Sequence, residues 1–515
     1  MYCSKCGSRI PGNARYCPNC GTRQTMGVTL EENICSDKDQ NREQGIQKAR
    51  RRGRRLGNLL VSGAALLILF AGNEKVPDNI AGTAFAADAS RFTIQNEKEM
   101  VICDRQGTMC KVDVPKKLLY SGDRRQMAYV DRDGELYALD HLDPVFVDDH
   151  VTDAKLSFYG DSVVYVRTAE DRGEELCIYN WQTKSIERLE TEGCTAFAVS
   201  SDGQTAAFLE AEGGGTLSLW PCRGTKSEVA QNVTALLAVP DGGNKVLYQS
   251  FGRQICFYDG REEKELSSGD GNICLLTNEN QTEFLYTEGK RAWYYCAGME
   301  EPTRLSGVKG SVQTDCYPGD TAYQQEQGLI LGRRTLKQMA FATYDPDGSS
   351  RLYYLDWRGA HAETIMNRAD QFWIAGNGRS LLCLSEQKLY RIDDAEDPSR
   401  RVCLSGEQKV CQFAADPKLR NVWFATPNRE LYFVKKGECV RLTGELNRLQ
   451  GLLEDGLLFL EGQDLYFADG EEKTLIQTAV EEVWIQEQNY AVIDTDGERY
   501  YLKDLKDAVY LMGSR

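Results

Sequence analysis

The chain has 515 residues, of which 41% are hydrophobic and 27% are charged, and its formal net charge is −16. That length leaves room for several hundred residues of folded core. Residues 1–55 hold twelve Lys/Arg and five Asp/Glu, a net of +7, so residues 56–515 carry −23. The acidic bulk argues against nucleic acid as the partner of the large domain, because it would repel phosphates.

The N-terminal segment contains two Cys-x-x-Cys-Gly motifs. A two-residue gap lets both sulfurs of a pair reach one metal ion, and the glycine permits the positive φ that turns backbone N–H groups toward the sulfurs. Two disulfides or four free thiols are the alternatives. The duplicated spacing predicts instead a Zn²⁺ site made by Cys3, Cys6, Cys17 and Cys20.

This zinc site is expected to be structural, because four cysteines leave no coordination position open for water. A domain over residues 1–24 is too small to bury a core, so metal binding would supply most of its folding free energy. The motif, with Tyr16 before the second pair, resembles the short zinc ribbons that open many bacterial membrane-anchored proteins. The resemblance covers roughly 24 residues and says little about the rest of the chain. Partner recognition is the expected role of the ribbon, and nucleic-acid contact is the less favoured alternative.

The segment after the ribbon predicts a linker followed by a membrane helix. Residues 25–55 are polar and then basic, and residues 56–72 carry no charge. A helix of this length spans about 25 Å, against about 30 Å of hydrocarbon, and Arg54 and Arg55 can extend to the interface. The basic flank predicts a single-pass protein of the cell membrane, with the N-terminus cytoplasmic and the C-terminal domain extracytoplasmic.

Two other interpretations of the apolar segment stay open. It resembles the apolar region of a secretory signal, with Ala84-Phe85-Ala86 as a cleavage site, but 55 preceding residues are too many for a signal. It is also compatible with a buried helix of a soluble protein. With a membrane helix, residues 73–90 become an outer tether.

Residues 91–515 predict repeated β-strands. Short apolar or alternating runs are separated by Gly, Asp and Asn, and an apolar–aromatic pair recurs after a tight turn. An eleventh copy, residues 100–113, precedes the ten clear ones. Successive copies lie 40, 41, 38, 38, 59, 37, 42, 34 and 35 residues apart, aligned on Leu136, Leu176, Leu217, Ile255, Trp293, Leu352, Leu389, Leu431, Leu465 and Tyr500.

One unit illustrates the expected anatomy, with strands over 236–239, 245–249, 254–258 and 264–267. Four short strands in about 40 residues is the period of a propeller blade. The repeats resemble WD40-like and TolB-type propellers, although the Gly-His…Trp-Asp signature is missing. The expected fold class is therefore mostly β: zinc ribbon, single transmembrane helix, then β-propeller-type four-stranded repeats. A sandwich or a β-solenoid is the alternative.

The number of blades stays open at this stage. Ten or eleven copies exceed the usual ceiling of about eight. Some copies could be two hairpins of one blade, or the repeats could divide between two propellers. The 59-residue gap marks either a domain boundary or a long insertion near residues 308–340.

Four Asp-rich turns could open calcium loops, but the bidentate glutamate of such a loop is absent, and Asp and Gly are what a hairpin turn requires. They begin at Asp131, Ser200, Asp345 and Asp494. His141 and His150 flank an Asp-rich segment where a weak metal site is conceivable, and His361 is expected in a loop. Cys103 and Cys110 are expected to face each other across a hairpin. The tryptophans at repeat ends, Trp181, Trp220, Trp293 and Trp357, are expected to pack between blades.

No catalytic motif is present, and no catalytic or cofactor-binding residue is predicted. The preferred function is a membrane-anchored binding or scaffold protein, with a cytoplasmic zinc ribbon and an extracytoplasmic propeller that recognises an unidentified protein or extracellular ligand. Whether the protein is an enzyme is left open. The alternatives are a propeller-based hydrolase of glycans or peptides and a cytoplasmic scaffold or regulator.

Overall fold

A computed structural model describes residues 91–513 of the chain, apart from short gaps. The gaps are residues 123, 170–172, 192, 212–214, 268–272, 289–290, 309–310, 313–321, 325–327, 332–335, 337–338, 345–349, 357–360, 376–378, 417, 454–455, 487–489, 504 and 506. The four ligands predicted for zinc and the predicted helix over residues 56–72 lie outside the described residues.

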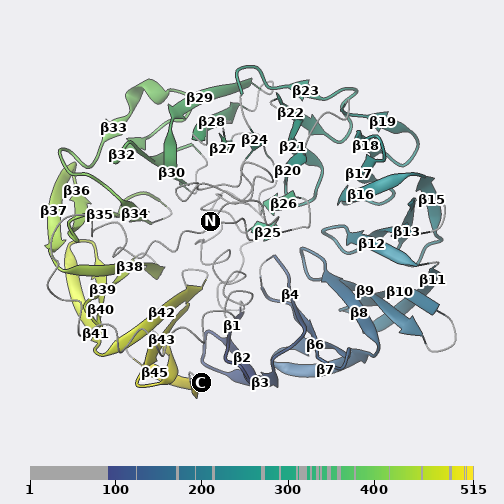
Figure 1. Cartoon of the computed structure of the whole chain (residues 1–515), viewed down its shortest axis with the longest axis horizontal. Helices are drawn as coiled ribbons and strands as arrows, with labels where there is room; N and C mark the ends of the chain where they lie inside the picture. Colours follow the sequence, from purple (N-terminus) through teal and green to yellow (C-terminus); the bar gives the residue numbers. More distant parts are fainter. Residues whose placement is uncertain are drawn as a thin grey trace, which may run out of the picture.

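The described residues form eleven sheets arranged in a ring, a β-propeller, and all of their strand pairs are antiparallel except β20 with β26 (Figure 1). Sheet 1 has three strands, and sheet 6 has six because it takes up an extra hairpin. Each of the other nine described sheets has four strands. In the four-stranded sheets the strands follow one another in sequence order, and the first strand lies nearest the centre of the ring.

The strands of sheets 1 to 5 are as follows. Sheet 1 contains β1 (Arg91–Gln95), β2 (Glu99–Asp104) and β3 (Met109–Asp113). Sheet 2 contains β4 (Lys117–Tyr120), β5 (Met127–Val130), β6 (Leu136–Asp140) and β7 (Asp143–Asp148). Sheet 3 contains β8 (Val151–Leu156), β9 (Ser162–Ala169), β10 (Gly173–Asn180) and β11 (Ser185–Thr191). Sheet 4 contains β12 (Cys194–Val199), β13 (Thr205–Glu210), β14 (Thr216–Pro221) and β15 (Ser227–Ala230). Sheet 5 contains β16 (Val233–Ala238), β17 (Val246–Ser250), β18 (Ile255–Tyr258) and β19 (Glu263–Glu265).

The strands of sheets 6 to 8 include the inserted hairpin. Sheet 6 contains β20 (Ile273–Thr277), β21 (Glu283–Glu288), β22 (Arg291–Cys296), β23 (Thr303–Arg304), β25 (Ala322–Gln324) and β26 (Gly328–Leu331). Sheet 7 contains β24 (Ser311–Val312), β27 (Met339–Tyr344), β28 (Ser350–Asp356) and β29 (His361–Asn367). Sheet 8 contains β30 (Ala369–Ile374), β31 (Leu381–Ser385), β32 (Lys388–Ile392) and β33 (Val402–Cys403), with the short 3₁₀ helix η2 (Pro398–Arg400) before β33.

Sheets 9 to 11 complete the ring. Sheet 9 contains β34 (Gln412–Ala415), β35 (Val422–Ala425), β36 (Leu431–Lys435) and β37 (Glu438–Thr443). Sheet 10 contains β38 (Leu446–Leu453), β39 (Gly456–Glu461), β40 (Asp464–Asp469) and β41 (Glu472–Gln477). Sheet 11 contains β42 (Val480–Gln486), β43 (Tyr490–Thr495), β44 (Glu498–Lys503) and β45 (Asp507–Gly513).

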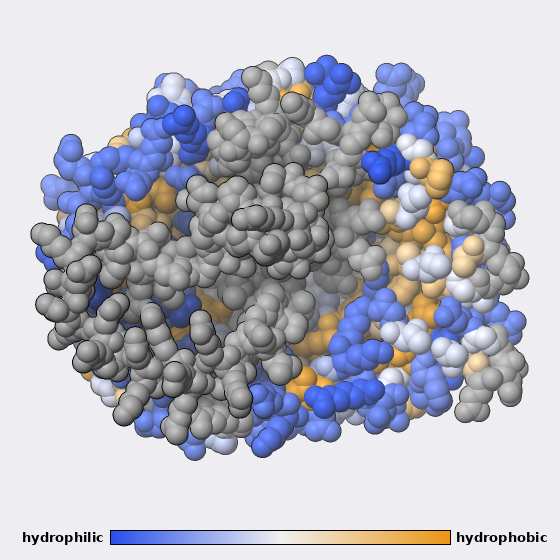
Figure 2. Space-filling view, in the orientation of Figure 1, coloured by the Kyte–Doolittle hydropathy of each residue, from blue (hydrophilic) through white to orange (hydrophobic). Residues whose placement is uncertain are grey.

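The hydrophobic core lies between neighbouring sheets. A second strand such as β13 has a sheet against each of its faces, so all six of its residues are buried. An outer strand such as β41 has mostly exposed residues. In Figure 2 the rim of the ring is mostly hydrophilic, and hydrophobic residues show between the sheets on the side of β4 to β16.

The ring closes between its last and first sheets. Phe92 and Ile94 of β1 pack in one cluster with Val492, Tyr501 and Leu511 of sheet 11. The Tyr501 hydroxyl donates to the carbonyl of Arg105 at 3.1 Å, and the side chain of Asn96 donates to the carbonyl of Gly513 at 3.2 Å. The described sheets therefore form one ring.

The sequence repeat marks the third strand of a sheet. Each of the ten aligned residues, from Leu136 to Tyr500, falls on the third strand of a different sheet. The interpretations of two hairpins per blade or of two propellers are wrong. The long gap near residues 308–340 contains an insertion between β24 and β27, not a boundary between two rings.

The single transmembrane helix of the expected fold class is not supported. Among the helices that the structure describes, none has the length and apolar character needed to cross a bilayer. The fold class is corrected to a β-propeller that follows an N-terminal zinc ribbon. The predicted placement of the two ends of the chain on opposite sides of a membrane depended on that helix, and it stays an untested prediction.

Two smaller predictions are also corrected. His361 is the first residue of β29 rather than a loop residue. Cys103 pairs with Met109 and Cys110 pairs with Ile102, so the two thiols are offset by one residue and point to opposite faces of sheet 1. Both cysteines are free.

Candidate functional site

A six-residue turn joins the first and second strands in several sheets. In sheets 2, 3, 4, 6 and 9 its first residue carries a side-chain oxygen that accepts the backbone N–H five residues on. The backbone N–H of that first residue donates in turn to the carbonyl of the last one. The turns begin at Ser121, Ser157, Ser200, Asn278 and Asp416. Ser, Asn and Asp suit this place because their short side chains bond nearby backbone groups.

The fourth residue of this turn adopts a positive φ, which favours glycine. It is Gly160 in sheet 3 and Gly203 in sheet 4, with φ of 81° and 68°. A Cβ at Gly203 would lie 2.8 Å from Oγ of Ser162, so the turns of sheets 3 and 4 are in close contact.

These turns lie on one face of the ring, which we call the inner-turn face, because antiparallel strands return alternately to the two faces. Hydrogen bonds join them from sheet to sheet. The N–H of Gly122 donates to the carbonyl of Phe158 at 2.6 Å, and that of Tyr159 donates to the carbonyl of Ser201 at 3.0 Å. Sheets 2, 3 and 4 are thus linked through their turns.

The same chain of bonds continues into sheets 5 and 6. The N–H of Asp202 donates to Oδ1 of Asp241 at 2.9 Å, and the N–H of Asp241 donates to the carbonyl of Asn280 at 3.0 Å. The buried side chain of Gln281 accepts from the N–H of Val239 at 3.0 Å. Since each turn is held by the next, this part of the face is pre-formed.

Acidic residues recur in four successive turns of this face. They belong to sheets 3 to 6, and we call them the acidic arc: Asp161, Asp202, Asp241 and Glu279. Burial raises the pKa of Asp241 to about 7, and the nearby carboxylate of Asp202 adds to the rise. The arc therefore combines negative charge with one carboxyl group that titrates near neutral pH.

An inserted hairpin lies beside the acidic arc. The chain leaves β24, forms β25 and β26, and returns to β27, so the insertion replaces the inner turn of sheet 7. β26 pairs in parallel with β20, the innermost regular strand of sheet 6, and the hairpin lies toward the centre of the ring (Figure 1). Glu283 anchors the returning segment by accepting the backbone N–H of Leu336 at 2.8 Å.

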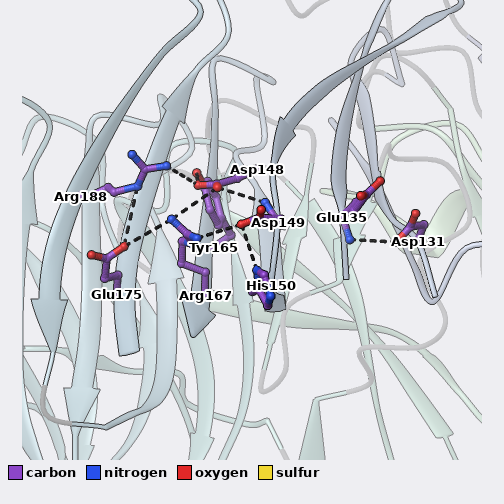
Figure 3. Close-up of polar contacts among 9 residues, drawn as sticks. All are labelled: Asp131, Glu135, Asp148, Asp149, His150, Tyr165, Arg167, Glu175 and Arg188. Carbon is purple, nitrogen blue, oxygen red and sulfur yellow. Dashed lines mark hydrogen bonds and ion pairs between the residues drawn. The ribbon is translucent and has the colours of Figure 1, made fainter. Parts of the chain in front are cut away.

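A second polar cluster lies at the opposite face, between sheets 2 and 3 (Figure 3). Asp148, at the end of β7, accepts from the hydroxyl of Tyr165 and from the guanidinium of Arg188, both at 2.7 Å. Arg167 lies 2.8 Å from Asp149 and 3.7 Å from Glu175. Asp148 and Glu175 are buried, so each needs these cationic partners.

This Asp148 cluster joins two sheets rather than holding a reactive group. Its carboxylates are shared between Arg167 and Arg188. Burial raises the pKa of the neighbouring Cys177 thiol to about 12, and it also raises the pKa of the Tyr165 phenol. Neither group is therefore activated as a nucleophile.

Other thiols in the described part of the ring are also held protonated. Burial raises the pKa of each of four further cysteines to about 12: Cys103, Cys194, Cys256 and Cys383. These side chains serve as small hydrophobic residues in the core.

The structure separates the candidate residues of the Asp-rich turns. The turns at Asp131 and Asp494 join second and third strands, whereas Ser200 begins an inner turn. Oδ1 of Asp131 accepts the backbone N–H groups of Asp133 and Glu135, so it serves the turn itself. The Asp345 turn lies outside the described residues. Across the described part of the chain, no three potential ligands gather at a metal-binding distance.

The two histidines of the Asp-rich segment lie apart. His141 follows β6, the third strand of sheet 2, and His150 follows β7, the fourth strand of the same sheet. The whole of β7 therefore lies between them. His150 contacts Asp149 at 3.1 Å.

Trp220 is buried between sheets, and Trp181 and Trp293 are half-buried against the core, so these three pack as expected. Trp357 lies outside the described residues.

Sequence reasoning missed the acidic arc. Its members lie in successive turns but at different positions within them, and only Asp202 belongs to one of the Asp-rich turn motifs. The regular signal is a polar residue that begins the turn, such as Ser121, Ser157 or Asn278. An alignment of the repeats on their third strands would bring these turns together.

Comparison with known proteins supports the N-terminal domain. Residues 2–24 match the zinc-ribbon domain, so the chain begins with a zinc ribbon. No curated protein matches the chain.

Three crystal structures show a limited likeness to the ring. A chain of the mitotic checkpoint complex is 11% identical, with 55% of this chain and 95% of that chain covered and a TM-score of 0.31. TolB from Acinetobacter baumannii is 13% identical, with 40% and 59% covered and a TM-score of 0.26. A eukaryotic initiation factor is 11% identical, with 68% and 95% covered and a TM-score of 0.40.

Proposed function

We propose that the protein is a binding scaffold whose ring holds a basic protein segment on the inner-turn face. The observation that carries this proposal is the acidic arc, in which the partly accessible Asp161, Asp202 and Asp241 lie in successive turns that are hydrogen-bonded to one another. The fourth member, Glu279, is buried in the next turn. A surface held in this way loses little conformational entropy when it binds.

The charge of the arc selects the partner. Asp161, Asp202 and Asp241 are all partly accessible, and the inner turns of sheets 3 to 6 contain only Lys245 as a basic residue. Lys and Arg side chains would find complementary charge here, whereas an acidic partner would be repelled. The inserted hairpin β25–β26 borders the same region and gives it a wall toward the centre of the ring.

The zinc ribbon supplies a second binding module. We assign its structural Zn²⁺ to the thiolates of Cys3, Cys6, Cys17 and Cys20, which provide the four sulfur ligands of a closed tetrahedral site. A scaffold of this kind would join a partner of the ribbon to a partner of the ring.

The ring's part of the proposal is tested with synthetic peptides. The full-length chain is titrated into a fluorescent eight-residue arginine peptide and, separately, into a glutamate peptide of the same length. The variant Asp202→Asn/Asp241→Asn removes two charges of the arc while it keeps the oxygen acceptors. The control Asp133→Asn/Asp496→Asn makes the same change at two exposed residues of the opposite face.

We expect the arginine peptide to bind and the glutamate peptide not to bind. The arc variant should raise the Kd about five- to tenfold, since each exposed ion pair contributes up to about 1 kcal/mol. The control should change the Kd less than about twofold. Equal losses in the two variants would show that binding follows net charge alone, and the proposed face would be wrong.

A further inference from the structure

The inner edge of one sheet of the ring already holds an added strand. β26 pairs in parallel with β20 through Leu275, Leu276 and Thr277, on the side of β20 that faces the centre of the ring (Figure 1). A first strand can therefore receive an extended segment on its inner edge, which is the recognition mode called β-augmentation. The neighbouring sheets 4 and 5 differ in whether this edge is open.

A lysine closes the inner edge of β12 in sheet 4. The inner turn of this sheet contains a bond from the N–H of Ser200 to the carbonyl of Thr205. By the alternation of an antiparallel pair, Phe197 then directs its N–H and C=O away from β13, toward the inner edge. The ammonium group of Lys155 donates to that carbonyl at 2.7 Å and lies 5.0 Å from the centre of the Phe197 ring. Lysine placed in this way blocks the addition of a further strand.

The inner edge of β16 in sheet 5 lacks such a cap. The N–H of Ser250 in β17 donates to the carbonyl of Gln254, toward β18, so Tyr248, two residues earlier, also faces β18. Its partner Leu236 in β16 therefore directs its N–H and C=O toward the inner edge. Within the described residues, no strand pairs with this edge of β16, and no side chain bonds to the backbone of Leu236.

The difference between the two edges has a cause in the sequence. Thr152, Thr195 and Thr234 hold the same place in β8, β12 and β16, because each donates its hydroxyl to a carbonyl of the second strand, at 3.2, 3.3 and 3.2 Å. Three residues later sheet 3 has Lys155, whereas sheet 4 has Ala198, which carries no donor. Sheet 4 therefore cannot cover β16 as sheet 3 covers β12.

The charges beyond the end of β16 select the occupant of its edge. First strands run toward the inner-turn face, so a segment parallel to β16 would end at the acidic arc, beside Asp202 and Asp241. The strand on the neighbouring edge is apolar, and in the sequence Arg333 and Arg334 follow it closely. Apolar residues suit the half-buried Leu236, and basic residues complement the arc.

We propose that the inner edge of β16 binds an extended segment of the partner protein, parallel to β16, in which apolar residues are followed by two or more basic residues. This inference rests on the proposed function, since the acidic arc receives the basic end of the segment. Backbone hydrogen bonds to β16 supply affinity, and the charge of the arc fixes the direction of the segment. Because β12 is capped and β20 is occupied, β16 is the open edge of sheets 4 to 6.

The test uses the full-length chain and fluorescent peptides based on residues 328–334, GLILGRR. One control peptide ends in two glutamates instead of two arginines. Two others carry backbone N-methyl groups, either on both leucines or on the first glycine and the isoleucine, so that each removes the donors of one edge of the strand. The Kd of each peptide is measured, and hydrogen exchange is followed with and without the unmodified peptide.

The unmodified peptide should bind, and one of the two methylated peptides should bind at least about tenfold more weakly, because two backbone hydrogen bonds are lost. The other should keep its Kd within about twofold, since its methyl groups lie on the edge away from β16. Exchange of the Leu236 amide should slow at least about tenfold on binding, while that of Phe197, on the capped edge, stays unchanged.

If both methylated peptides bind as well as the unmodified one while the glutamate peptide does not bind, the added strand is wrong and the acidic arc stands. If neither GLILGRR nor the arginine peptide binds, the proposed function fails as well. Slow exchange of Leu236 without any peptide would also overturn the proposal, because the chain itself would fill the edge. If that protection rises with protein concentration, the occupant is a second copy instead.

Discussion

The backbone N–H of Asp202 donates a 2.9 Å hydrogen bond to Oδ1 of Asp241, so a carboxyl group of sheet 5 holds the inner turn of sheet 4. The same contact places two acidic side chains side by side. Burial raises the pKa of Asp241, the hydrogen bond from the Asp202 N–H opposes the rise, and the charge of the Asp202 carboxylate adds to it. One pair of residues thus joins two blades and supplies half of the acidic arc.

The first prediction concerns the pH dependence of stability. The folded-state pKa of Asp241 is about 7, above the unfolded value near 3.8, so the folded chain binds the extra proton between these values. This group's contribution is therefore fully present below about pH 4, is lost as the pH rises to about 7, and is constant above it. Asp241→Asn should remove this loss and raise the free energy of unfolding at pH 8 by about 1 kcal/mol.

Denaturant unfolding between pH 5 and 8 measures the effect. Asp259→Asn is the control, because hydrogen bonds from the N–H groups of Glu262 and Arg261 lower the pKa of that exposed carboxyl group. In the control, the free energy of unfolding should change with pH above pH 5 as it does in the natural chain. If the free energy of unfolding of the Asp241→Asn protein fell with pH as steeply as that of the natural chain, Asp241 would not be the source of the pH dependence.

The second prediction concerns the Asp148 cluster (Figure 3). Asp148→Ala leaves Arg167 and Arg188 facing each other without the carboxylate that they share, and it removes the acceptor of the Tyr165 hydroxyl. Breaking a buried ion pair in this way costs about 3 kcal/mol of stability. Urea unfolding measures the loss.

The neighbouring Asp149→Ala is the matched control, because the Asp149 side chain is 48% exposed although it also contacts Arg167. Its cost should be below about 1 kcal/mol. Similar costs for the two variants would mean that burial does not distinguish their roles.

The third prediction concerns the inserted hairpin. Glu283→Ala removes the acceptor of both the Leu336 N–H and the Tyr294 hydroxyl, which lie 2.8 and 3.0 Å from Oε2. Losing these buried bonds should cost about 2 kcal/mol and speed proteolysis of the insertion. Glu263→Ala, which also loses a bond to a tyrosine, Tyr248, is the control because it holds no part of the insertion. Faster cleavage in both variants would show a global effect instead.

The fourth prediction concerns the metal. Purified full-length protein should contain one Zn²⁺ per chain by elemental analysis, and Cys17→Ser should lose most of it, since each thiolate fills one of four positions. Cys35→Ser, which lies outside the motif, should keep the full content. Equal zinc in the two variants would contradict the assigned ligands.

The repeat was predictable because the blades are similar in the sequence of their third strand. Leu136 to Tyr500 mark third strands, which pack against neighbouring sheets on both faces and therefore keep an apolar–aromatic signature. The number of sheets was not predictable, because the pattern of one blade does not say how many blades close a ring. The closing contacts, such as Tyr501 with Arg105, join residues 396 positions apart.

The site was harder to predict from the sequence than the fold. Asp202 and Asp241 are ordinary turn residues when each is considered alone, and their proximity arises only from the stacking of sheets 4 and 5. The Asp148 cluster was hidden for the same reason, since Arg167 and Arg188 come from two strands of a different sheet. The zinc ligands, in contrast, are close in sequence and form a motif by themselves.

The most direct test of the proposed binding face is hydrogen exchange of the full-length chain with and without the arginine peptide. The account predicts protection at the inner turns of sheets 3 to 6, which are residues 157–162, 200–205, 239–245 and 278–283. Protection confined to turns of the opposite face, such as 131–135, or spread evenly over both faces, would contradict it.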